Sequence, residues 1–257
     1  MGLCYSGTSY CGWQSQPGGC GVQDHLESAL AQFLGCPTRT VCAGRTDAGV
    51  HALGQVVHFD VPLQREPSSW VRGVNAFLPR DIAVQWARTD LPTTFDARRS
   101  AYQRRYRYVL RNHPVRPALD HARVGWTHRP VDLDRLRAAA QCLLGEHDFS
   151  AFRSSECQAH SPVKTVQAID IWREGDYLIF DLRANAFLHH MVRNIVGSLL
   201  AVGNGSKPVS WLAEVLNNRD RRLAAPTFMA DGLYFIGPDY PAEFNLPPTP
   251  TRIGLLI

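Results

Sequence analysis

The sequence predicts an α+β fold in two halves, each an antiparallel sheet covered by helices. In the first half, periodic segments run strand, helix, strand, strand, helix, strand, which is the split unit of ferredoxin-like domains. The second half follows a similar coarse order, although no internal sequence repeat is convincing. The 257 residues are 45% hydrophobic, enough to bury one large core or two adjoining smaller ones.

Hydrophobic periodicity defines the elements of the first half. Apolar residues recur at helical spacing over 22–34 and again over 70–78, where Pro67 and Ser68 precede the helix. Apolar and polar residues alternate over 55–61, which predicts a half-buried strand. Further strands are expected over 3–5, 40–43 and 82–88.

The second half begins with a predicted strand over 101–110. After it we expect a helix over 133–144 that ends at Gly145, a hairpin of strands 165–172 and 177–184, helices over 188–202 and 211–216, and a closing strand over 233–236. The chain therefore divides into a first subdomain of residues 1–100 and a second of residues 101–241. The Pro-rich residues 242–257 are expected to form an extended surface segment.

Composition argues against membrane, secreted and metal-binding classes. No apolar run reaches the roughly 20 residues of a membrane-spanning helix, and the N-terminus lacks the pattern of a secretory signal, so we expect a cytoplasmic protein. Seven cysteines without a Cys-x-x-Cys pair indicate reduced thiols rather than a disulfide framework or a zinc site. His189 and His190 would diverge by about 100° on the predicted helix, so no metal site is assigned.

Arginines concentrate between residues 98 and 116, among the aromatic residues Tyr102, Tyr106 and Tyr108. They are Arg98, Arg99, Arg104, Arg105, Arg107, Arg111 and Arg116. Guanidinium groups bind phosphate and aromatic rings stack on bases, so this composition is typical of an RNA-binding surface. The alternative is a solvated strand in a chain that prefers arginine throughout, because Lys164 and Lys207 are its only lysines. A formal charge of +4 is compatible with both interpretations.

One carboxylate, Asp47, lies in a loop between two predicted strands, with Gly44 and Gly49 on either side. Glycine lets the backbone bring a neighbouring side chain close to a ligand, which makes Asp47 a candidate nucleophile. The alternative is an Asx turn, in which the carboxylate only accepts hydrogen bonds from nearby N–H groups.

The loop belongs to a longer segment, Gly44-Arg45-Thr46-Asp47-Ala48-Gly49-Val50-His51-Ala52, followed by Gly54-Gln55-Val56. This segment resembles the signature of the TruA-type tRNA pseudouridine synthases. Other blocks resemble the family's remaining motifs in the same order: Tyr5 with Gly12-Trp13-Gln14, Arg104-Arg105-Tyr106-Arg107-Tyr108, Gly145-Glu146-His147-Asp148-Phe149, Asn185-Ala186-Phe187-Leu188-His189-His190-Met191-Val192-Arg193, and Gly232-Leu233-Tyr234. The resemblance extends from the first residues to Pro241.

This resemblance implies two ferredoxin-like, RRM-like subdomains whose sheets join into one extended sheet around a central cleft. It also implies a homodimer that grips tRNA and needs no cofactor or metal. The implied reaction isomerises uridine to pseudouridine at positions 38, 39 and 40 of the tRNA anticodon stem-loop. The glycosidic bond breaks, the uracil turns, and C5 joins C1′.

The resemblance implies roles for five residues. Asp47 attacks C1′ or promotes elimination across the sugar, Arg193 keeps Asp47 ionised, and Arg45 helps to extrude the target nucleotide. Tyr106 stacks under the target base, and Leu233 closes the other side of the uracil pocket. The sequence also allows structural roles. Arg193 could bind another carboxylate and Arg45 a phosphate, while Tyr106 and Leu233 could be core residues.

Two other functions compete with this one. A glycosidase or nucleoside hydrolase would use Asp47 with a second carboxyl group as the acid, for which Asp60, Asp96 and Asp148 are candidates that no spacing distinguishes. A non-catalytic RNA-binding protein or tRNA chaperone would use the arginine and tyrosine surface alone. The presence of Asp47 favours an enzyme over such a protein.

Overall fold

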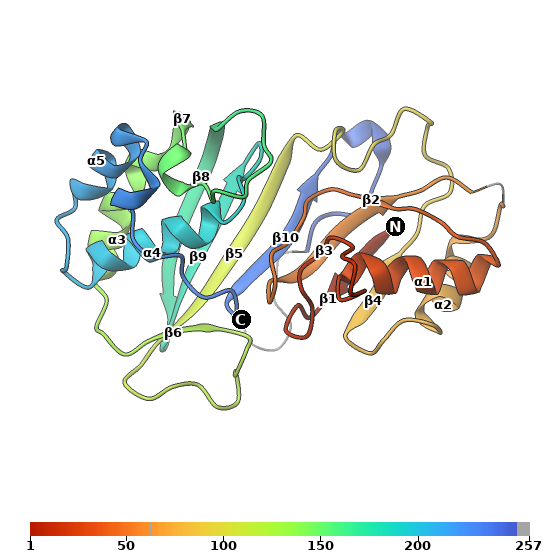
Figure 1. Ribbon diagram of the computed structural model, residues 1–257, viewed down its shortest axis with the longest axis horizontal. Coiled ribbons are helices and arrows are strands. Elements are labelled where there is room, and N and C mark those ends of the chain that lie inside the picture. The colour runs from red at the N-terminus through yellow and green to blue at the C-terminus, as the bar shows by residue number, and fades with distance from the viewer. Residues whose placement is uncertain (62, 251–257) are drawn as a thin grey trace. The chain divides into compact units, whose positions relative to one another are not determined.

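The computed structural model describes residues 1–61 and 63–250, which divide into two compact units (Figure 1). The first unit contains Met1–Arg104 together with the described residues from Tyr234 onward, and the second contains Arg105–Leu233. The chain therefore returns to its first unit after completing the second. A division based on sequence order alone, at residues 100 and 241, does not include this return.

The first unit is built on a mixed sheet with the strand order β4-β1-β3-β10. Its elements are β1 (Gly2–Tyr5), α1 (Val22–Leu34), β2 (Val41–Cys42), β3 (His51–His58), α2 (Pro67–Asn75), β4 (Ile82–Trp86) and β10 (Leu233–Asp239). β1 pairs antiparallel with β3 and β4, and β2 pairs antiparallel with β3. β10 runs parallel to β3, so the sheet is not purely antiparallel. The predicted α+β class and the strand–helix order of this half are confirmed.

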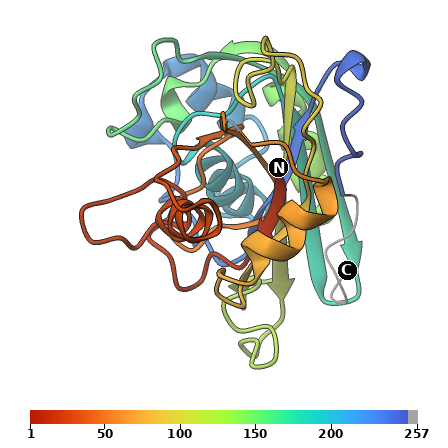
Figure 2. The same ribbon diagram turned by 90° about the vertical axis from the view of Figure 1, so that its right-hand side faces the viewer.

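Two helices with apolar faces cover this sheet (Figure 2). α1 ends at Gly35, whose φ of 75° is the left-handed conformation common at helix ends. α2 begins with Pro67, which suits a first helical position because its missing N–H would have no partner there. The rings of Phe33 and Trp70 pack edge to face, with centroids 5.4 Å apart, and this contact joins the two helices.

Strand β3 begins earlier than the alternation over 55–61 predicts, at His51, and is buried over most of its length. The Val57 side chain is fully buried in the core. Val56, its neighbour in the strand, belongs to a hydrophobic cluster that also contains Phe95 and Phe244. Because both faces are covered, the residues do not alternate between core and solvent as in a half-buried strand. Phe244 lies in a 3-10 turn, so part of the predicted extended tail is packed, and residues 251–257 of that tail lie outside the described residues.

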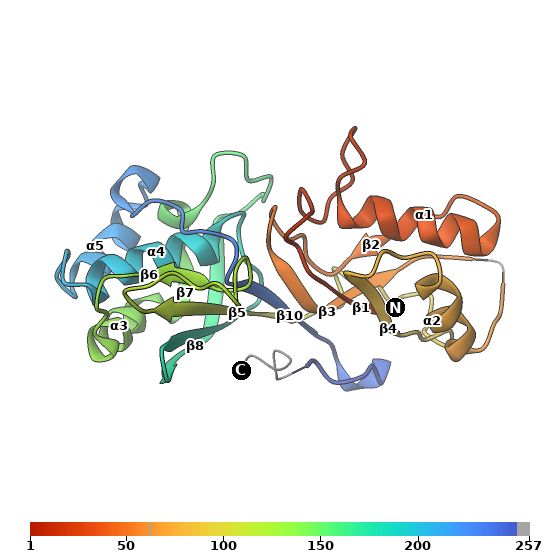
Figure 3. The ribbon, with the colours of Figure 1, turned by 90° about the horizontal axis from the view of Figure 1, so that it is seen from below.

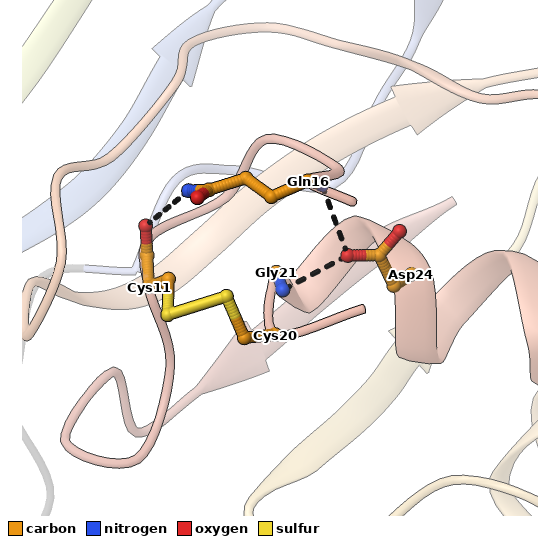
Figure 4. The surroundings of a disulfide bond; sticks show 5 residues. All are labelled: Cys11, Gln16, Cys20, Gly21 and Asp24. Carbon is orange, nitrogen blue, oxygen red and sulfur yellow. Dashed lines mark hydrogen bonds between the residues drawn. A yellow bond between two sulfur atoms is a disulfide. The ribbon is translucent and has the colours of Figure 1, made fainter. Parts of the chain in front are cut away.

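Cys11 and Cys20 form a disulfide bond, contrary to the expectation that all cysteines are reduced (Figure 4). The chain between them turns back on itself, with positive φ at Gly12 and Gly19. The Cys11 N–H donates to the Cys20 carbonyl at 3.0 Å, and the two Cα atoms are 5.4 Å apart. This separation suits a disulfide, and such proximity created by loop geometry leaves no Cys-x-x-Cys signature in the sequence.

The second unit contains a sheet with the order β5-β9-β8-β7 and the helices α3, α4 and α5 (Figure 3). Its elements are β5 (Gln103–Asn112), β6 (Gly125–Thr127), α3 (Leu133–Ala140), β7 (Gly145–Asp148), β8 (Val163–Glu174), β9 (Tyr177–Ala184), α4 (Met191–Gly203) and α5 (Trp211–Asn218). β8 pairs antiparallel with β7 and β9, whereas β6 runs parallel to β5. No helix in residues 1–61 and 63–250 has the length and apolar character needed to cross a membrane.

Two boundaries in this unit differ from the sequence prediction for identifiable reasons. α4 begins at Met191 rather than at residue 188, because His190 has a φ of 63° and cannot continue a right-handed helix. α3 ends at Ala140 rather than at residue 144, because Gln141–Leu143 tightens into a 3-10 turn. Gly145, with a φ of 95°, then starts the unpredicted strand β7, which is too short for alternation to reveal.

Candidate active site

The Asp47 loop connects β2 to β3 in the first unit and is fixed mainly through Thr46. The Thr46 carbonyl accepts a hydrogen bond from the Trp13 N–H at 3.0 Å. The Thr46 hydroxyl forms a hydrogen bond with the Tyr5 hydroxyl at 2.8 Å. On the other side of the loop, the Gln55 side-chain amide donates to the Gly44 carbonyl at 2.6 Å. Thr46 is only 6% exposed, so these bonds are shielded from water and hold the residue before Asp47 firmly.

Close packing of the backbone at residue 12 against the Asp47 loop explains why this residue is glycine. A Cβ atom on Gly12 would lie 2.6 Å from the Thr46 carbonyl oxygen, and Gly12 has a φ of 97°. Both facts require glycine at this position. The Gly49 N–H also donates to the Tyr10 carbonyl at 3.4 Å. Residues 10–13 therefore support the loop on both sides of Asp47.

Asp47 itself is partly exposed at the turn into β3. Its carbonyl accepts the Val50 N–H at 3.1 Å, and Gly49 supplies the positive φ of 79° within this turn. A main-chain bond therefore closes the turn. A carboxylate that is partly open to solvent on a fixed backbone is suited to meet a ligand.

Arg45, two residues before Asp47, is exposed. Its positive charge also acts on the Cys42 thiol of β2. Burial raises the pKa of that thiol to about 11, and the charge of Arg45 opposes the increase. Cys42 therefore stays protonated at neutral pH and is not a competing nucleophile in this loop.

The second unit carries Arg193 in the first turn of α4. The Arg193 Nε donates to the Phe228 carbonyl at 2.8 Å, and the Phe228 N–H donates back to the Arg193 carbonyl at 3.3 Å. This reciprocal pair fixes the orientation of the guanidinium group. Phe228 also packs against the Tyr108 ring of β5, with centroids 5.8 Å apart, which links the Arg193 contact to the sheet.

Tyr106 and Leu233 are both largely buried, at 8% and 4% exposure. Tyr106 lies in β5 and meets the Phe187 ring at 5.1 Å in an edge-to-face arrangement. Leu233 starts β10, and its N–H donates to the Ala230 carbonyl at 2.8 Å. Asp47 and Arg45 thus belong to the first unit, and Tyr106, Arg193 and Leu233 to the second.

Two arginines of strand β5, Arg105 and Arg107, bind a buried carboxylate, which neither the RNA-binding nor the solvated-strand interpretation predicts. Arg105 donates to one Asp181 oxygen at 2.7 Å, and Arg107 donates twice to the other, at 2.9 and 2.8 Å. Asp181 is 1% exposed, and the Arg107 guanidinium also lies over the Trp172 ring. The pattern of residues on β5 could not reveal this, because the partner carboxylate comes from β9.

The two adjacent histidines do not diverge as the sequence predicts for neighbouring residues on a helix. His189 and His190 precede α4 rather than lying on it, and their ring centroids are 4.0 Å apart. The left-handed conformation of His190 brings the rings together, whereas neighbouring residues on a helix would diverge.

Sequence reasoning also missed a pocket of about 510 Å³ in the second unit. It is lined by Ser150, Arg153, Ser154, Ser155, His190, Arg221 and Thr227. These residues come from four separate places in the chain, so no local motif could indicate the pocket. Its two arginines lie outside the arginine-rich segment that the composition emphasised.

Comparisons with known proteins agree with the motif blocks found in the sequence. The tRNA pseudouridine synthase family model matches residues 4–98 and 139–241. The chain is 60% identical over 248 residues to the tRNA pseudouridine synthase A of Burkholderia cenocepacia, which covers 96% of this chain and 92% of that protein. It is 61% identical over 247 residues to the same-named protein of Methylibium petroleiphilum, covering 96% and 95%.

Among solved structures, a chain of the "Cbf5-Nop10-Gar1 Complex" shares 12% identity with a TM-score of 0.37, covering 79% of this chain and 45% of that chain. The family model covers most of this chain, and the curated relatives exceed half identity over nearly all of it. The chain therefore belongs to the tRNA pseudouridine synthase family.

Proposed function

We propose that this protein, as a tRNA isomerase of that family, converts uridine to pseudouridine at positions 38, 39 and 40 of the anticodon stem-loop, with Asp47 as its essential carboxylate. One observation carries the proposal. Asp47 is partly exposed on a loop held by the buried Thr46, within a chain that matches its family over nearly all its length. A catalytic carboxylate needs such a fixed backbone and access to the substrate.

The reaction needs no net change in atoms or electrons. In the nucleophilic route, the Asp47 carboxylate bonds C1′ as the C1′–N1 bond breaks and the uracil leaves with that electron pair. The uracil turns, C5 attacks C1′, and the carboxylate leaves. C5 then loses its proton and N1 gains one. In the elimination route, Asp47 instead takes a proton from C2′ as the C1′–N1 bond breaks and the uracil leaves with that electron pair. When C5 bonds C1′ across the resulting double bond, C2′ regains a proton; C5 then loses its proton and N1 gains one.

The remaining candidates fit supporting roles in this scheme. The contact of Arg193 with the Phe228 carbonyl supports a fixed guanidinium that keeps a carboxylate ionised. The exposed Arg45 suits contact with RNA displaced around the target nucleotide. The ring of Tyr106 and the side chain of Leu233 suit the two apolar faces of a uracil site. We further propose that two copies of the chain act together as a homodimer.

The hydrolase alternative loses two of its three candidate acids. Burial alone would raise the pKa of Asp96, but hydrogen bonds from the Arg99 and Arg98 N–H groups outweigh burial and lower it. The pKa of Asp148 is also lowered, since the Ser150 bonds and nearby arginines outweigh burial. A general acid in glycoside hydrolysis needs a raised pKa, so these carboxyl groups are tuned in the wrong direction.

The test is release of tritium from C5-labelled uridine in tRNA. C5 exchanges its hydrogen for C1′ only during isomerisation, so the wild-type protein should release tritium. Asp47→Asn should lose at least about 10³-fold in rate, as expected when an essential nucleophile is removed. Asp60→Asn is the matched control, because Asp60 is exposed in the same unit, and it should retain wild-type release.

Each alternative predicts a distinct product. Free uracil would indicate a hydrolase, and tight tRNA binding without tritium release would indicate a non-catalytic binding protein. Mapping the modified nucleotides in the product tRNA then tests the assignment to positions 38, 39 and 40.

A further inference from the structure

The pocket of about 510 Å³ in the second unit has the chemistry of an anion site. Its lining provides two guanidinium groups, one imidazole ring and four hydroxyl groups, and includes no carboxylate. The volume lies within the roughly 300–1,000 Å³ typical of ligand pockets, so a phosphate can enter with its flanking sugars.

Both arginines of the pocket bond only neutral acceptors within the described part of the chain. Arg153 Nη2 donates to the carbonyls of Cys157 and Ala159, at 2.7 and 2.8 Å. Arg221 Nη2 donates to Asn194 Oδ1 at 3.0 Å and to the Thr227 hydroxyl at 3.1 Å. These bonds orient the guanidinium groups without neutralising their charge, unlike the bonds of Arg105 and Arg107 to Asp181.

Two further charged side chains lie near Arg153 of the pocket, an ammonium and a carboxylate. Burial lowers the pKa of the Lys164 ammonium and the charge of Arg153 lowers it further, which places a third cation close to Arg153. Asp148 is also near enough to feel Arg153, but its oxygens are engaged by the Ser150 N–H at 2.9 Å and by Arg219 at 3.7 Å. Partly desolvated guanidinium groups that no carboxylate hydrogen-bonds favour binding of an anion.

The pocket shares its framework with Arg193. Asn194, which accepts from Arg221, follows Arg193 in α4 and also accepts the Thr227 hydroxyl at 2.7 Å. Thr227 in turn precedes Phe228, whose carbonyl holds Arg193. A ligand in the pocket would therefore lie one residue away from the contact that orients Arg193.

We propose that this pocket binds a backbone phosphate of the tRNA substrate, with Arg153 and Arg221 as the cationic donors and the Ser and Thr hydroxyls completing the site. Guanidinium groups bind phosphate oxygens in paired, charge-assisted hydrogen bonds. Contacts to phosphate fix the register of an RNA without reading its sequence. The inference rests on the proposed function, since it assigns part of the tRNA to this unit.

The main test introduces a negative charge without removing any pocket bond. Ser155 is exposed, and its hydroxyl makes no hydrogen bond within the described residues, so Ser155→Asp should fold normally. Ser206→Asp is the matched control, because Ser206 is also exposed in the same unit but does not line the pocket. Affinity for tRNA is measured by fluorescence anisotropy across a salt series.

We expect Ser155→Asp to weaken tRNA binding by about 10-fold at low salt. The slope of log affinity against log salt should fall by roughly 0.7–0.9, the value of one phosphate contact. KM for tRNA should rise while kcat stays unchanged at saturation, because a positioning contact is lost. Ser206→Asp should match the wild type in every measurement.

A second pair of variants removes cations instead. Arg153→Gln and Arg221→Gln should reduce the salt slope, whereas Arg222→Gln should not, because Arg222 is neutralised by Asp220 at 2.7 Å. Thermal melting of each variant separates loss of folding from loss of binding.

Wild-type affinity and salt slope in Ser155→Asp would overturn the proposal. Inorganic phosphate provides a second arm. If it raises the melting temperature of the wild type but not of Ser155→Asp, while both bind tRNA equally, the pocket takes a small phosphate and the RNA assignment is wrong. The binding assay does not depend on turnover, so absence of tritium release would reject the proposed function without deciding this inference.

Discussion

The two units hold their candidate catalytic residues in different ways. In the first, main-chain bonds from residues 10–13 fix the loop around Asp47, and the Cys11–Cys20 disulfide closes the segment that supplies them. In the second, buried side chains fix β5 and its Tyr106, above all the Asp181 carboxylate that binds two arginines of this strand. The geometry of the Asp47 loop should therefore depend on closure of the segment between Cys11 and Cys20. The geometry of β5 should depend on the buried Asp181 carboxylate.

Removing the buried charge of Asp181 should cause the largest loss in the free energy of unfolding. Asp181→Asn leaves Arg105 and Arg107 without their counter-ion, and breaking such a buried pair costs about 3–5 kcal/mol. Urea unfolding measures the loss. Asp170→Asn is the control, because its pair with Arg183 is largely exposed and should contribute under about 1 kcal/mol. Equal small losses in both variants would contradict the proposed difference between the units.

Removing the disulfide that closes the loop should cause a smaller loss of stability, confined to the first unit. A disulfide between cysteines at a sequence separation of 9 restricts the unfolded chain, which stabilises the fold by about 2–3 kcal/mol. Cys20→Ser should therefore lower the melting temperature, and dithiothreitol should lower it in the wild type but not in the variant. Cys36→Ser is the control, because Cys36 is free and exposed. No response of the wild type to dithiothreitol would show that the bond does not stabilise the loop.

The contrast between the units also explains what the sequence could predict. The Asp47 loop is one continuous segment between two strands, so its motif and its place in the fold are readable from local sequence. The order of helices and strands is equally local. The support that Thr46 receives from Trp13 is not, because it joins residues far apart in the chain.

The second unit was harder to predict because its important contacts cross between strands and loops. Periodicity places Arg105 and Arg107 on one face of β5 but does not identify the Asp181 partner on β9. The pocket arginines come from two distant parts of the chain, Arg153 directly after one 3-10 turn and Arg221 at the start of another, so no single segment of the sequence marks the pocket. The density of arginine in a sequence therefore does not indicate which guanidinium groups bind a carboxylate within the fold.

The smallest predicted effect on stability comes from Asp24 in the first unit, and this effect depends on pH. Asp24 bonds the Gly21 N–H at 2.9 Å and the Gln16 N–H at 3.4 Å, beside the disulfide (Figure 4). Burial alone would raise the pKa of Asp24, but the bonds from Ser15, Gly21 and Gln16 outweigh burial and lower it. A lowered pKa in the folded state stabilises the protein above the unfolded-state pKa, and this stabilisation is lost as pH falls through the folded-state pKa.

Asp24→Asn should therefore cost about 1 kcal/mol at pH 7, and the difference from wild type should shrink toward pH 3. Thermal melting at both pH values measures it. Asp132→Asn in the second unit is the control, since Asp132 caps α3 and asparagine caps a helix equally well. Combined with Cys20→Ser, Asp24→Asn tests whether the bonds and the disulfide act on one element. Losses that add within about 0.5 kcal/mol indicate independent contributions, whereas a larger deviation indicates that both close the same loop.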